Sequence, residues 1–388
     1  MQEVLGQRLG WVVRAVFDNP GVTVKVGDDP TATVRYAVIP ALGNARFLLP
    51  LASARVTAAS LLAYNALRPP KVRAGRAAVG VLARVGLLGL TNAPVLSVHA
   101  DKPEDLLSGF LAAELGYGRL HAAIGIRPPD PHHKPTLQLF DDQGRPRGYA
   151  KIGWNDGTRA MVRAEAATLA ALPAGGGFPP APQLKLHTQW HGREIAVIEP
   201  MPRDVRRIRR PDSPRLDAML AVARRGGPAT APVPVTGLIA GWRDRAKDAD
   251  SRIHGFIDKL DTGLTLEFGD WHGDWVPWNM ARHRGGLLVW DWENRAAGVP
   301  VGFDLAHQAF QTALSTHGKP AAACAEAVDA ALAAYGPALG LDAARQRFVA
   351  DAYLVELWLR TYELSGGGAG WNPKLHPALL DVLEARHG

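Results

Sequence analysis

The pattern of apolar and polar residues first defines a mixed stretch over residues 1–118. Residues 33–51 (TVRYAVIPALGNARFLLPL) form two extended apolar segments around a Gly-Asn turn pair. Apolar residues then recur at helical spacing in three segments, 53–67, 72–90 and 103–115. We expect an α/β module here, and it contains no catalytic constellation.

Residues 119–202 show the two-residue period of a small antiparallel sheet, interrupted by one helix. Tight turns join neighbouring segments, which favours hairpins. The helix covers residues 158–172 and is closed by Pro173 and the glycines at 175–177. The predicted strands are 121–127, 136–140, 148–153, 183–190 and 194–199.

Residues 203–388 are mostly helical, with alanine-rich segments such as 320–334 and 343–363. A sheet-rich part followed by a helix-rich part is typical of an α+β protein with two lobes. The sequence thus predicts an accessory module over 1–118, a sheet lobe over 119–202 and a helical lobe over 203–388.

Composition narrows the class of protein. A chain of 388 residues with 47% hydrophobic residues is globular, not disordered. Cys324 is the single cysteine, so no intrachain disulfide forms, and a reducing, cytoplasmic location is expected. We see no signal peptide, and the apolar run 77–91 contains Arg84 and is too short to span a bilayer. It is interpreted as a core helix, with a membrane-surface helix as the alternative.

The formal net charge of +7 suits an anionic ligand. The chain lacks a nucleic-acid-binding motif and a lysine-rich tail, so nucleic acid is not an expected partner. Nothing in the sequence indicates an obligatory protein partner.

Candidate chemistry concentrates in residues 271–280, WHGDWVPWNM. Gly273 permits a sharp backbone corner before Asp274, and Asn279 follows five residues later. A turn at 282–286 with apolar arms predicts a hairpin that brings Asp291 back beside Asn279. Carboxylate and amide oxygens without cysteine or histidine suit a hard cation such as Mg²⁺.

Aromatic and imidazole side chains near this loop are interpreted as structural. Five tryptophans are expected to pack the back of the loop as core, with a stacking surface as the alternative: Trp271, Trp275, Trp278, Trp290 and Trp292. Three histidines are expected to be surface or hydrogen-bonded residues and not ligands: His187, His191 and His307.

A second candidate lies in the predicted sheet lobe. Glu165 shares a helix face with Met161, Leu169 and Leu172, and a buried carboxylate needs a partner. Lys151, on a strand between small or apolar residues, can supply that partner. Alternatively, Lys151 is solvated at a strand edge and Glu165 pairs with a local arginine; the pattern leaves both interpretations open.

These elements, in this order, resemble the aminoglycoside phosphotransferase and choline kinase family, small-molecule relatives of protein kinases. The resemblance rests on HGDWVPWNM, on VWDWE at 289–293 and on the later Gly302-Phe-Asp304, and it covers roughly residues 119–388. It implies a bilobal protein kinase-like fold, Mg-ATP as phosphate donor, and a hydroxylated small molecule as acceptor.

The resemblance also implies roles for matching residues. Asp274 would accept or orient the acceptor hydroxyl, and Asn279 and Asp291 would hold Mg²⁺. Lys151 would contact the nucleotide phosphates, with Glu165 holding it. The remaining assignments are a hinge that reads adenine, at Glu199 and Met201, a structural brace at Asp304, and an orienting role for His272.

Two segments depart from the family pattern. Residues 125–135 lack the repeated glycines of a protein-kinase phosphate loop. Lys134 or the neighbouring histidines could contact phosphate, although a solvated loop is the simpler interpretation. Residues 1–118 are not required by the family, and they could cap the active site, recruit a partner or buttress the sheet lobe.

The acceptor is the least determined part. Five arginines in residues 203–211 fit a phosphorylated or carboxylated acceptor, or form a solvated basic face. The positive net charge disfavours a cationic aminoglycoside as acceptor, although acidic residues such as Asp351 and Glu356 could bind one. A sugar-like hydroxylated metabolite is the preferred class. The alternatives are an aminoglycoside-modifying kinase, a catalytically silent nucleotide-binding regulator and a membrane-surface scaffold.

Overall fold

The computed structural model describes residues 2–63, 67–86, 92–130, 132–172, 179–208, 213–225, 231–284, 286–366 and 375–387. The chain forms two compact units. The first contains Met1–Ala171 and Pro182–Arg207, and the second contains Leu172–Ala181 and Ile208–Gly388. The predicted turn glycines at 175–177 lie outside the described residues.

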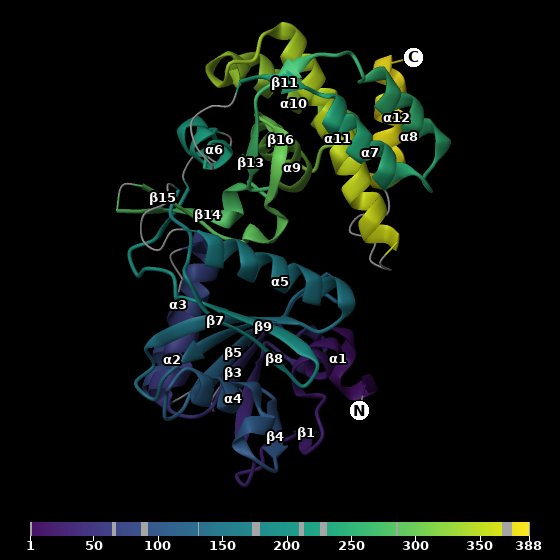
Figure 1. Cartoon of the computed structure of the whole chain (residues 1–388). Coiled ribbons are helices and arrows are strands. Elements are labelled where there is room, and N and C mark those ends of the chain that lie inside the picture. Colours follow the sequence, from purple (N-terminus) through teal and green to yellow (C-terminus); the bar gives the residue numbers. More distant parts are fainter. Residues whose placement is uncertain are drawn as a thin grey trace. The chain divides into compact units, whose positions relative to one another are not determined.

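A nine-stranded sheet organises the first unit (Figure 1). Its strand order is β1-β4-β2-β3-β5-β6-β7-β9-β8, and every neighbouring pair is antiparallel. The strands are β1 (Val22–Val26), β2 (Val34–Ile39), β3 (Phe47–Pro50), β4 (Val95–Ala100), β5 (His121–Gly125), β6 (Thr136–Phe140), β7 (Pro146–Gly153), β8 (Leu184–Trp190) and β9 (Arg193–Ile198); a short β10 (Arg206–Arg207) ends the unit.

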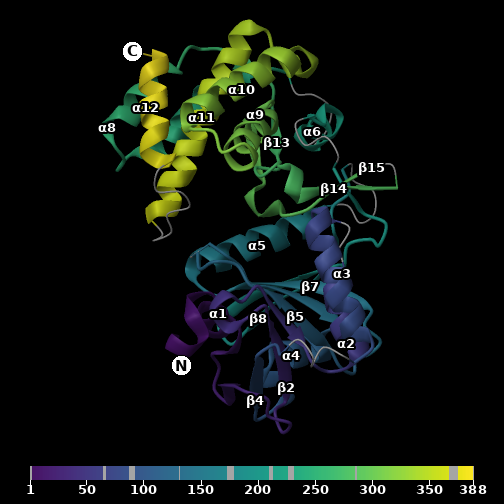
Figure 2. The ribbon, with the colours of Figure 1, turned by 180° about the vertical axis from the view of Figure 1, so that it is seen from behind.

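Helices cover both faces of this sheet. One face packs its alternate apolar residues against α1 (Gln2–Phe17) and α4 (Leu107–Glu114) in the largest core of the unit. The other face packs against α2 (Ala54–Leu62), α3 (Pro70–Arg84) and α5 (Asp156–Ala171). Figures 1 and 2 show α5 running along the sheet beside β7 and β9.

The sequence predicted the centre of this unit better than its beginning. The five strands predicted over 121–199 appear as β5–β9, and the helix predicted over 158–172 appears as α5. The strands β1 and β4 and the long α1 were not predicted. The sheet is also continuous across residue 118, because β3 pairs with β5 through Leu48 and Ile124. Residues before and after that predicted division therefore share one sheet and one core.

The second unit is mostly helical and contains short strand pairs. Its helices are α6 (Leu216–Ala223), α7 (Thr236–Ala246), α8 (Ser251–Lys259), α9 (Phe303–Gln311), α10 (Ala321–Tyr335), α11 (Ala343–Gly366) and α12 (Leu375–His387). Its strand pairs are β11 (Val233–Pro234) with β12 (Thr265–Leu266), β13 (Phe268–Trp271) with β16 (Ala296–Pro300), and β14 (Met280–His283) with β15 (Gly286–Val289).

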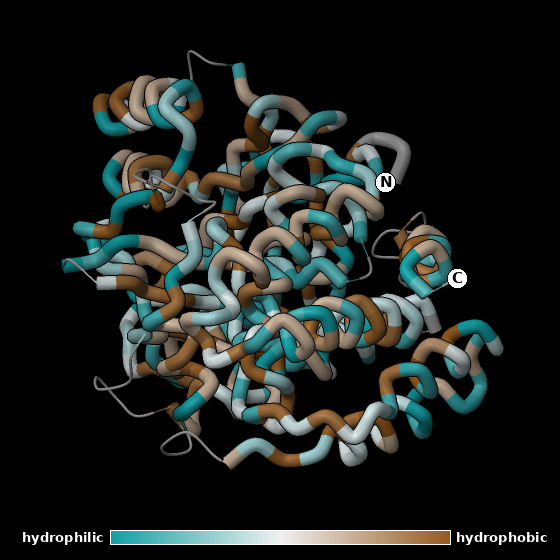
Figure 3. The backbone as a smooth tube through the Cα atoms, turned by 90° about the horizontal axis from the view of Figure 1, so that it is seen from above, coloured by the Kyte–Doolittle hydropathy of each residue, from teal (hydrophilic) through white to brown (hydrophobic). Residues whose placement is uncertain are grey.

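Large aromatic side chains fill the core of the second unit, including Trp242, Tyr353 and Trp358, each at most 1% exposed. Figure 3 shows that the C-terminal helix, which is seen nearly end-on, carries both hydrophobic and hydrophilic residues. The helices predicted over 320–334 and 343–363 appear as α10 and α11, so the predicted α+β class is confirmed. Within the described ranges, no helix combines the length and the apolar character needed to cross a bilayer.

Candidate active site

The loop that carries Asp274 begins after β13 with a corner at Gly273. Gly273 has a φ of +79°, in the left-handed region that other residues adopt only with strain. A Cβ atom at this position would lie 2.1 Å from the carbonyl oxygen of Asn294. The corner therefore requires glycine, as the sequence indicated.

Asp304, in the first turn of α9, holds this corner through the backbone. Its Oδ2 accepts from the backbone N–H of His272 at 2.9 Å, and its Oδ1 accepts from that of Gly273 at 3.1 Å. Burial raises the pKa of the Asp304 carboxyl to about 7, against the opposing effect of those two donors and of Arg360. This two-point contact fixes the loop to α9.

His272 orients the loop from its other side. The buried ring accepts from the backbone N–H of Asp274 at Nδ1 (3.2 Å) and donates from Nε2 to the carbonyl of Trp290 (3.1 Å). Burial lowers its pKa to about 4, so the ring is neutral at physiological pH. One acceptor and one donor nitrogen are what a neutral imidazole provides.

The Asp274 carboxylate is held by two side chains and remains about one-third exposed (32%). Its Oδ2 accepts from Asn279 Nδ2 at 2.7 Å, and its Oδ1 lies 3.2 Å from His307 Nε2. Burial alone would raise the Asp274 pKa, but the hydrogen bond from His307 and the nearby positive charge of Arg360 lower it overall. Asp274 is therefore ionised at neutral pH and able to accept a proton.

Three residues around this loop were not assigned to the site from the sequence. His307 is buried and hydrogen-bonded, as expected of it, but its partners are Asp274 and the Tyr353 hydroxyl, 3.1 Å from Nδ1. Arg360 donates to the carbonyl of Gly273 at 2.8 Å, and its guanidinium carbon lies 5.0 Å from the centre of the Trp271 ring. A sequence signal existed for His307 alone, because it lies three residues after Asp304 and so on the same helix face.

Asn279 and Asp291 are brought together by the predicted hairpin. β14 and β15 pair Met280 with Val289, and Trp290 donates its backbone N–H to the Asn279 carbonyl at 3.0 Å. Asp291 adopts a left-handed backbone conformation with a φ of 63°. Aspartate is among the non-glycine residues that adopt this conformation most readily.

The donor set of these two residues fits a hard cation. Asn279 uses Nδ2 to reach Asp274, so its Oδ1 is the atom that remains for coordination, and Asp291 supplies carboxylate oxygens. In the described part of the chain, His, Cys, Asp and Glu form no group of three or more that could bind a metal. Two oxygen-donating side chains match Mg²⁺, which keeps waters and binds through substrate phosphates.

Three of the five tryptophans of this region confirm the core interpretation, and Trp290 is half-buried. Trp271, Trp275 and Trp292 are at most 3% exposed, and Trp292 packs edge-on against the His272 ring at 4.5 Å. Trp278, in contrast, is 47% exposed, so its assignment to the core was wrong. It lies in a 3-10 turn, Pro277–Asn279, in which Asn279 is the buried residue.

In the first unit, Lys151 on β7 and Glu165 on α5 form a buried ion pair. Lys151 Nζ lies 2.6 Å and 2.7 Å from the two Glu165 carboxylate oxygens. Lys151 is 6% exposed and Glu165 is 1% exposed. Of the two interpretations left open by the sequence, the structure has the Lys151–Glu165 pair, on the sheet face that α5 covers.

The other predicted nucleotide-site residues lie at the end of β9. Glu199 and Met201 are half-buried, and Glu199 donates its backbone N–H to the Gln183 carbonyl at 2.9 Å. Arg203, Arg206 and Arg207 are exposed, whereas the arginines at 209 and 210 lie outside the described residues.

The loop between β5 and β6 is anchored by indole groups. Trp11 of α1 donates to the carbonyl of Arg127 at 3.0 Å, and Trp154 donates to that of His133 at 3.0 Å. Lys134 is half-buried, with Nζ 3.9 Å from Met161 Sδ. The loop is thus more tightly held than the expected solvated segment, and α1 contributes to holding it.

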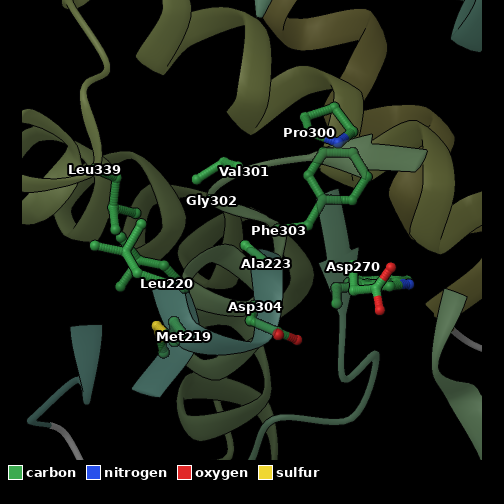
Figure 4. Close-up of a pocket in the computed structure, with 12 residues that line it drawn as sticks. Met219, Leu220, Ala223, Asp270, Pro300, Val301, Gly302, Phe303, Asp304 and Leu339 are labelled. Atoms are coloured by element: carbon green, nitrogen blue, oxygen red, sulfur yellow. The ribbon is translucent and has the colours of Figure 1, made fainter. Parts of the chain in front are cut away.

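A small cavity lies behind Asp304 in the second unit (Figure 4). It has a volume of about 10 Å³ and is lined by Asp304, Asp270 and apolar residues of α6, β16 and α9. Space for about one water molecule is too small for a nucleotide or an acceptor. This cavity is therefore part of the packing behind the loop.

No protein-family model matches the chain, and a search of curated proteins finds no relative. Solved structures do show similarity. A thermostable mutant of aminoglycoside phosphotransferase APH(4)-Ia, in a ternary complex with ADP and hygromycin B, is 11% identical and aligns over 73% of this chain and 99% of its own, with a TM-score of 0.46.

Two further structures give comparable results. A putative fructosamine-3-kinase from Haemophilus somnus 129PT is 13% identical, covers 71% of this chain and 96% of its own, and has a TM-score of 0.47. A glucosamine kinase is 15% identical, covers 69% of this chain and 92% of its own, and has a TM-score of 0.29. Identities this low assign no residue roles, which must come from the geometry of this chain.

Proposed function

We propose that the chain is a small-molecule kinase that transfers the γ-phosphate of Mg-ATP to a hydroxyl group. The observation that carries this proposal is the loop around Asp274. An ionised, partly exposed carboxylate is held between Asn279 and His307, and Asp304 and His272 fix the backbone that carries it. A positioned carboxylate beside a metal-binding amide is what phosphoryl transfer to an alcohol requires.

In the proposed reaction, Asp274 accepts the proton of the acceptor hydroxyl. The acceptor oxygen forms a bond to the γ-phosphorus, the bond from that phosphorus to the β,γ-bridging oxygen breaks, and ADP leaves with the electron pair. Asn279 and Asp291 would hold Mg²⁺, which when bound neutralises phosphate charge. The protein's contribution is thus positioning and electrostatics, and no covalent intermediate is needed.

The first unit supports the nucleotide part of the proposal. The Glu165 carboxylate holds the Lys151 ammonium group in one place, which suits an ammonium that contacts phosphate oxygens. Glu199 and Met201 follow the last residue of β9, and we assign the backbone of this segment to the adenine base. These assignments follow from the resemblance of the sequence to the aminoglycoside phosphotransferase and choline kinase family.

For the acceptor, we propose a sugar-like hydroxylated metabolite. The net charge of +7 favours a neutral or anionic acceptor over a polycationic one. Acidic residues that could attract a cation are already paired in the second unit: Glu356 accepts from Arg245 and Trp242, and Asp351 accepts from Arg386. A polycationic aminoglycoside would therefore find few available carboxylates on these residues.

The test is acceptor-dependent release of ADP from Mg-ATP. The panel contains neutral sugars, amino sugars, sugar phosphates, aminoglycosides and choline, with Asp274→Asn as the comparison and excess EDTA to remove Mg²⁺. We expect turnover with one acceptor class, reduced roughly a hundredfold or more by the substitution and stopped by EDTA. Mg-ATP binding without turnover on any acceptor would favour a silent regulator, and absence of nucleotide binding would refute the kinase proposal.

A further inference from the structure

A chain of three side chains from separate elements ends on the Asp274 carboxylate. Tyr353 lies in α11, His307 in α9 and Asp274 in the loop after β13. The Tyr353 hydroxyl is 3.1 Å from His307 Nδ1, and His307 Nε2 is 3.2 Å from Asp274 Oδ1. Tyr353 is completely buried and His307 is 4% exposed.

The chemistry of the end groups fixes the direction of these hydrogen bonds. An ionised carboxylate only accepts, so the Nε2 atom of His307 carries the proton and donates to Asp274. In a neutral ring the Nδ1 atom is then an acceptor, and the Tyr353 hydroxyl donates to it. Burial lowers the pKa of His307, and the charge of Arg360 adds to this effect, although Asp274 opposes both. A neutral ring is therefore the expected state.

The two Asp274 oxygens are thus directed by different partners. Oδ2 accepts from Asn279, a residue of the same loop, whereas Oδ1 is held by a ring that belongs to α9 and is itself held from α11. Asn279 alone leaves the carboxylate plane free to turn with the loop. The His307 contact ties that plane to two packed helices.

We propose that His307 and Tyr353 are positioning residues for Asp274. Tyr353 fixes the tautomer and orientation of the His307 ring, and His307 fixes the carboxylate so that its remaining lone pairs meet the acceptor hydroxyl. This inference rests on the proposed kinase function and adds to it two residues that are not among the proposed nucleotide and metal ligands. A correctly oriented base contributes to the rate and not to nucleotide affinity.

The test compares turnover with nucleotide binding in the full chain. Because the acceptor is unidentified, turnover is measured as ADP release from Mg-ATP with water as acceptor, and binding is measured with Mg-ADP by calorimetry. The variants are His307→Leu, which keeps volume but cannot donate, His307→Gln, whose amide N–H can donate, and Tyr353→Phe.

Matched controls make the same chemical changes away from the loop. Tyr362→Phe alters the same helix, α11, at a hydroxyl that donates to the Asp248 carbonyl. His376→Gln alters a ring in α12 whose Nδ1 lies 3.0 Å from the Thr361 hydroxyl. Neither control residue contacts Asp274 in any hydrogen bond of the described chain.

We expect His307→Leu to slow ADP release roughly 10- to 100-fold, because it removes a hydrogen bond to the charged Asp274 carboxylate. Tyr353→Phe should slow it about 3- to 10-fold, because it removes a hydrogen bond to the neutral His307 ring. Mg-ADP affinity stays within about twofold, and His307→Gln recovers most of the rate. A merely structural role predicts parallel losses of rate, binding and thermal stability, without rescue by glutamine.

Either of two results overturns the inference alone. One is wild-type turnover that His307→Leu leaves within about twofold, and the other is an equal loss of rate in the Tyr362→Phe control. A wild-type protein that neither binds Mg-ADP nor releases ADP refutes the proposed function, and this inference with it.

Discussion

The buried Lys151–Glu165 pair allows a quantitative prediction. Both oxygens of Glu165 lie within 2.7 Å of Lys151 Nζ, and neither residue is more than 6% exposed. Replacing Glu165 by Gln keeps the shape but removes the charge that balances the buried ammonium. Loss of one partner from a buried pair costs about 3–5 kcal/mol, roughly two to four powers of ten in the folding equilibrium.

The assay is urea unfolding of wild type, Glu165→Gln, Lys151→Met and the double variant Lys151→Met/Glu165→Leu. We expect the double variant to recover most of the stability, because an apolar pair of similar volume removes both desolvation costs. Mg-ADP binding should nevertheless weaken in that variant if Lys151 contacts phosphate. Stability and binding are thereby separated.

The matched control is Asp28→Asn in the same unit. Asp28 pairs with Arg35 at 2.8 Å, but its side chain is 56% exposed, and an exposed pair contributes about 0–1 kcal/mol. Burial does not make the Lys151–Glu165 pair costly to break if the free energy of unfolding of Glu165→Gln lies within about 1 kcal/mol of wild type, or if Glu165→Gln and Asp28→Asn lower it equally.

Three further predictions concern the loop and the N-terminal helix. Gly273→Ala should lower the free energy of unfolding in urea by at least about 3 kcal/mol, because its Cβ would meet the Asn294 carbonyl at 2.1 Å. Gly298→Ala should lower it far less, because the space around its Cβ is open. The pKa of His272 is near 6.5 in the unfolded chain and about 4 in the folded protein. Its contribution of about 3 kcal/mol to the free energy of unfolding is therefore complete above pH 6.5 and lost as pH falls to 4. His272→Asn should remove that part of the slope when the free energy of unfolding is measured against pH. Arg193→Ala removes a buried guanidinium that donates to carbonyls at the C-terminal end of α1. Limited proteolysis should therefore cut the end of α1 faster than in wild type. Unchanged protection would contradict an anchoring role for Arg193.

Local patterns in the sequence determined much of the fold and the centre of the candidate site. The two-residue period predicted β5–β9, and helical spacing predicted α5, α10 and α11, because these signals lie within short segments. The corner at Gly273 and the hairpin that returns Asp291 to Asn279 are also local, since each depends on a turn and its neighbours. A buried carboxylate on a helix face was enough to indicate a cationic partner for Glu165, although not to choose Lys151.

Tertiary structure decided what depends on residues far apart in the chain. The continuity of the sheet across residue 118 comes from the pairing of β3 with β5, and no pattern within either strand specifies its neighbour. His307 meets Asp274 across 33 positions, Tyr353 meets His307 across 46, and Arg360 meets Gly273 across 87. In the sequence, only the spacing of His307 from Asp304 marks a place at the loop. Tyr353 and Arg360 have an ordinary core or surface appearance, because their roles follow only from which helix packs beside the loop.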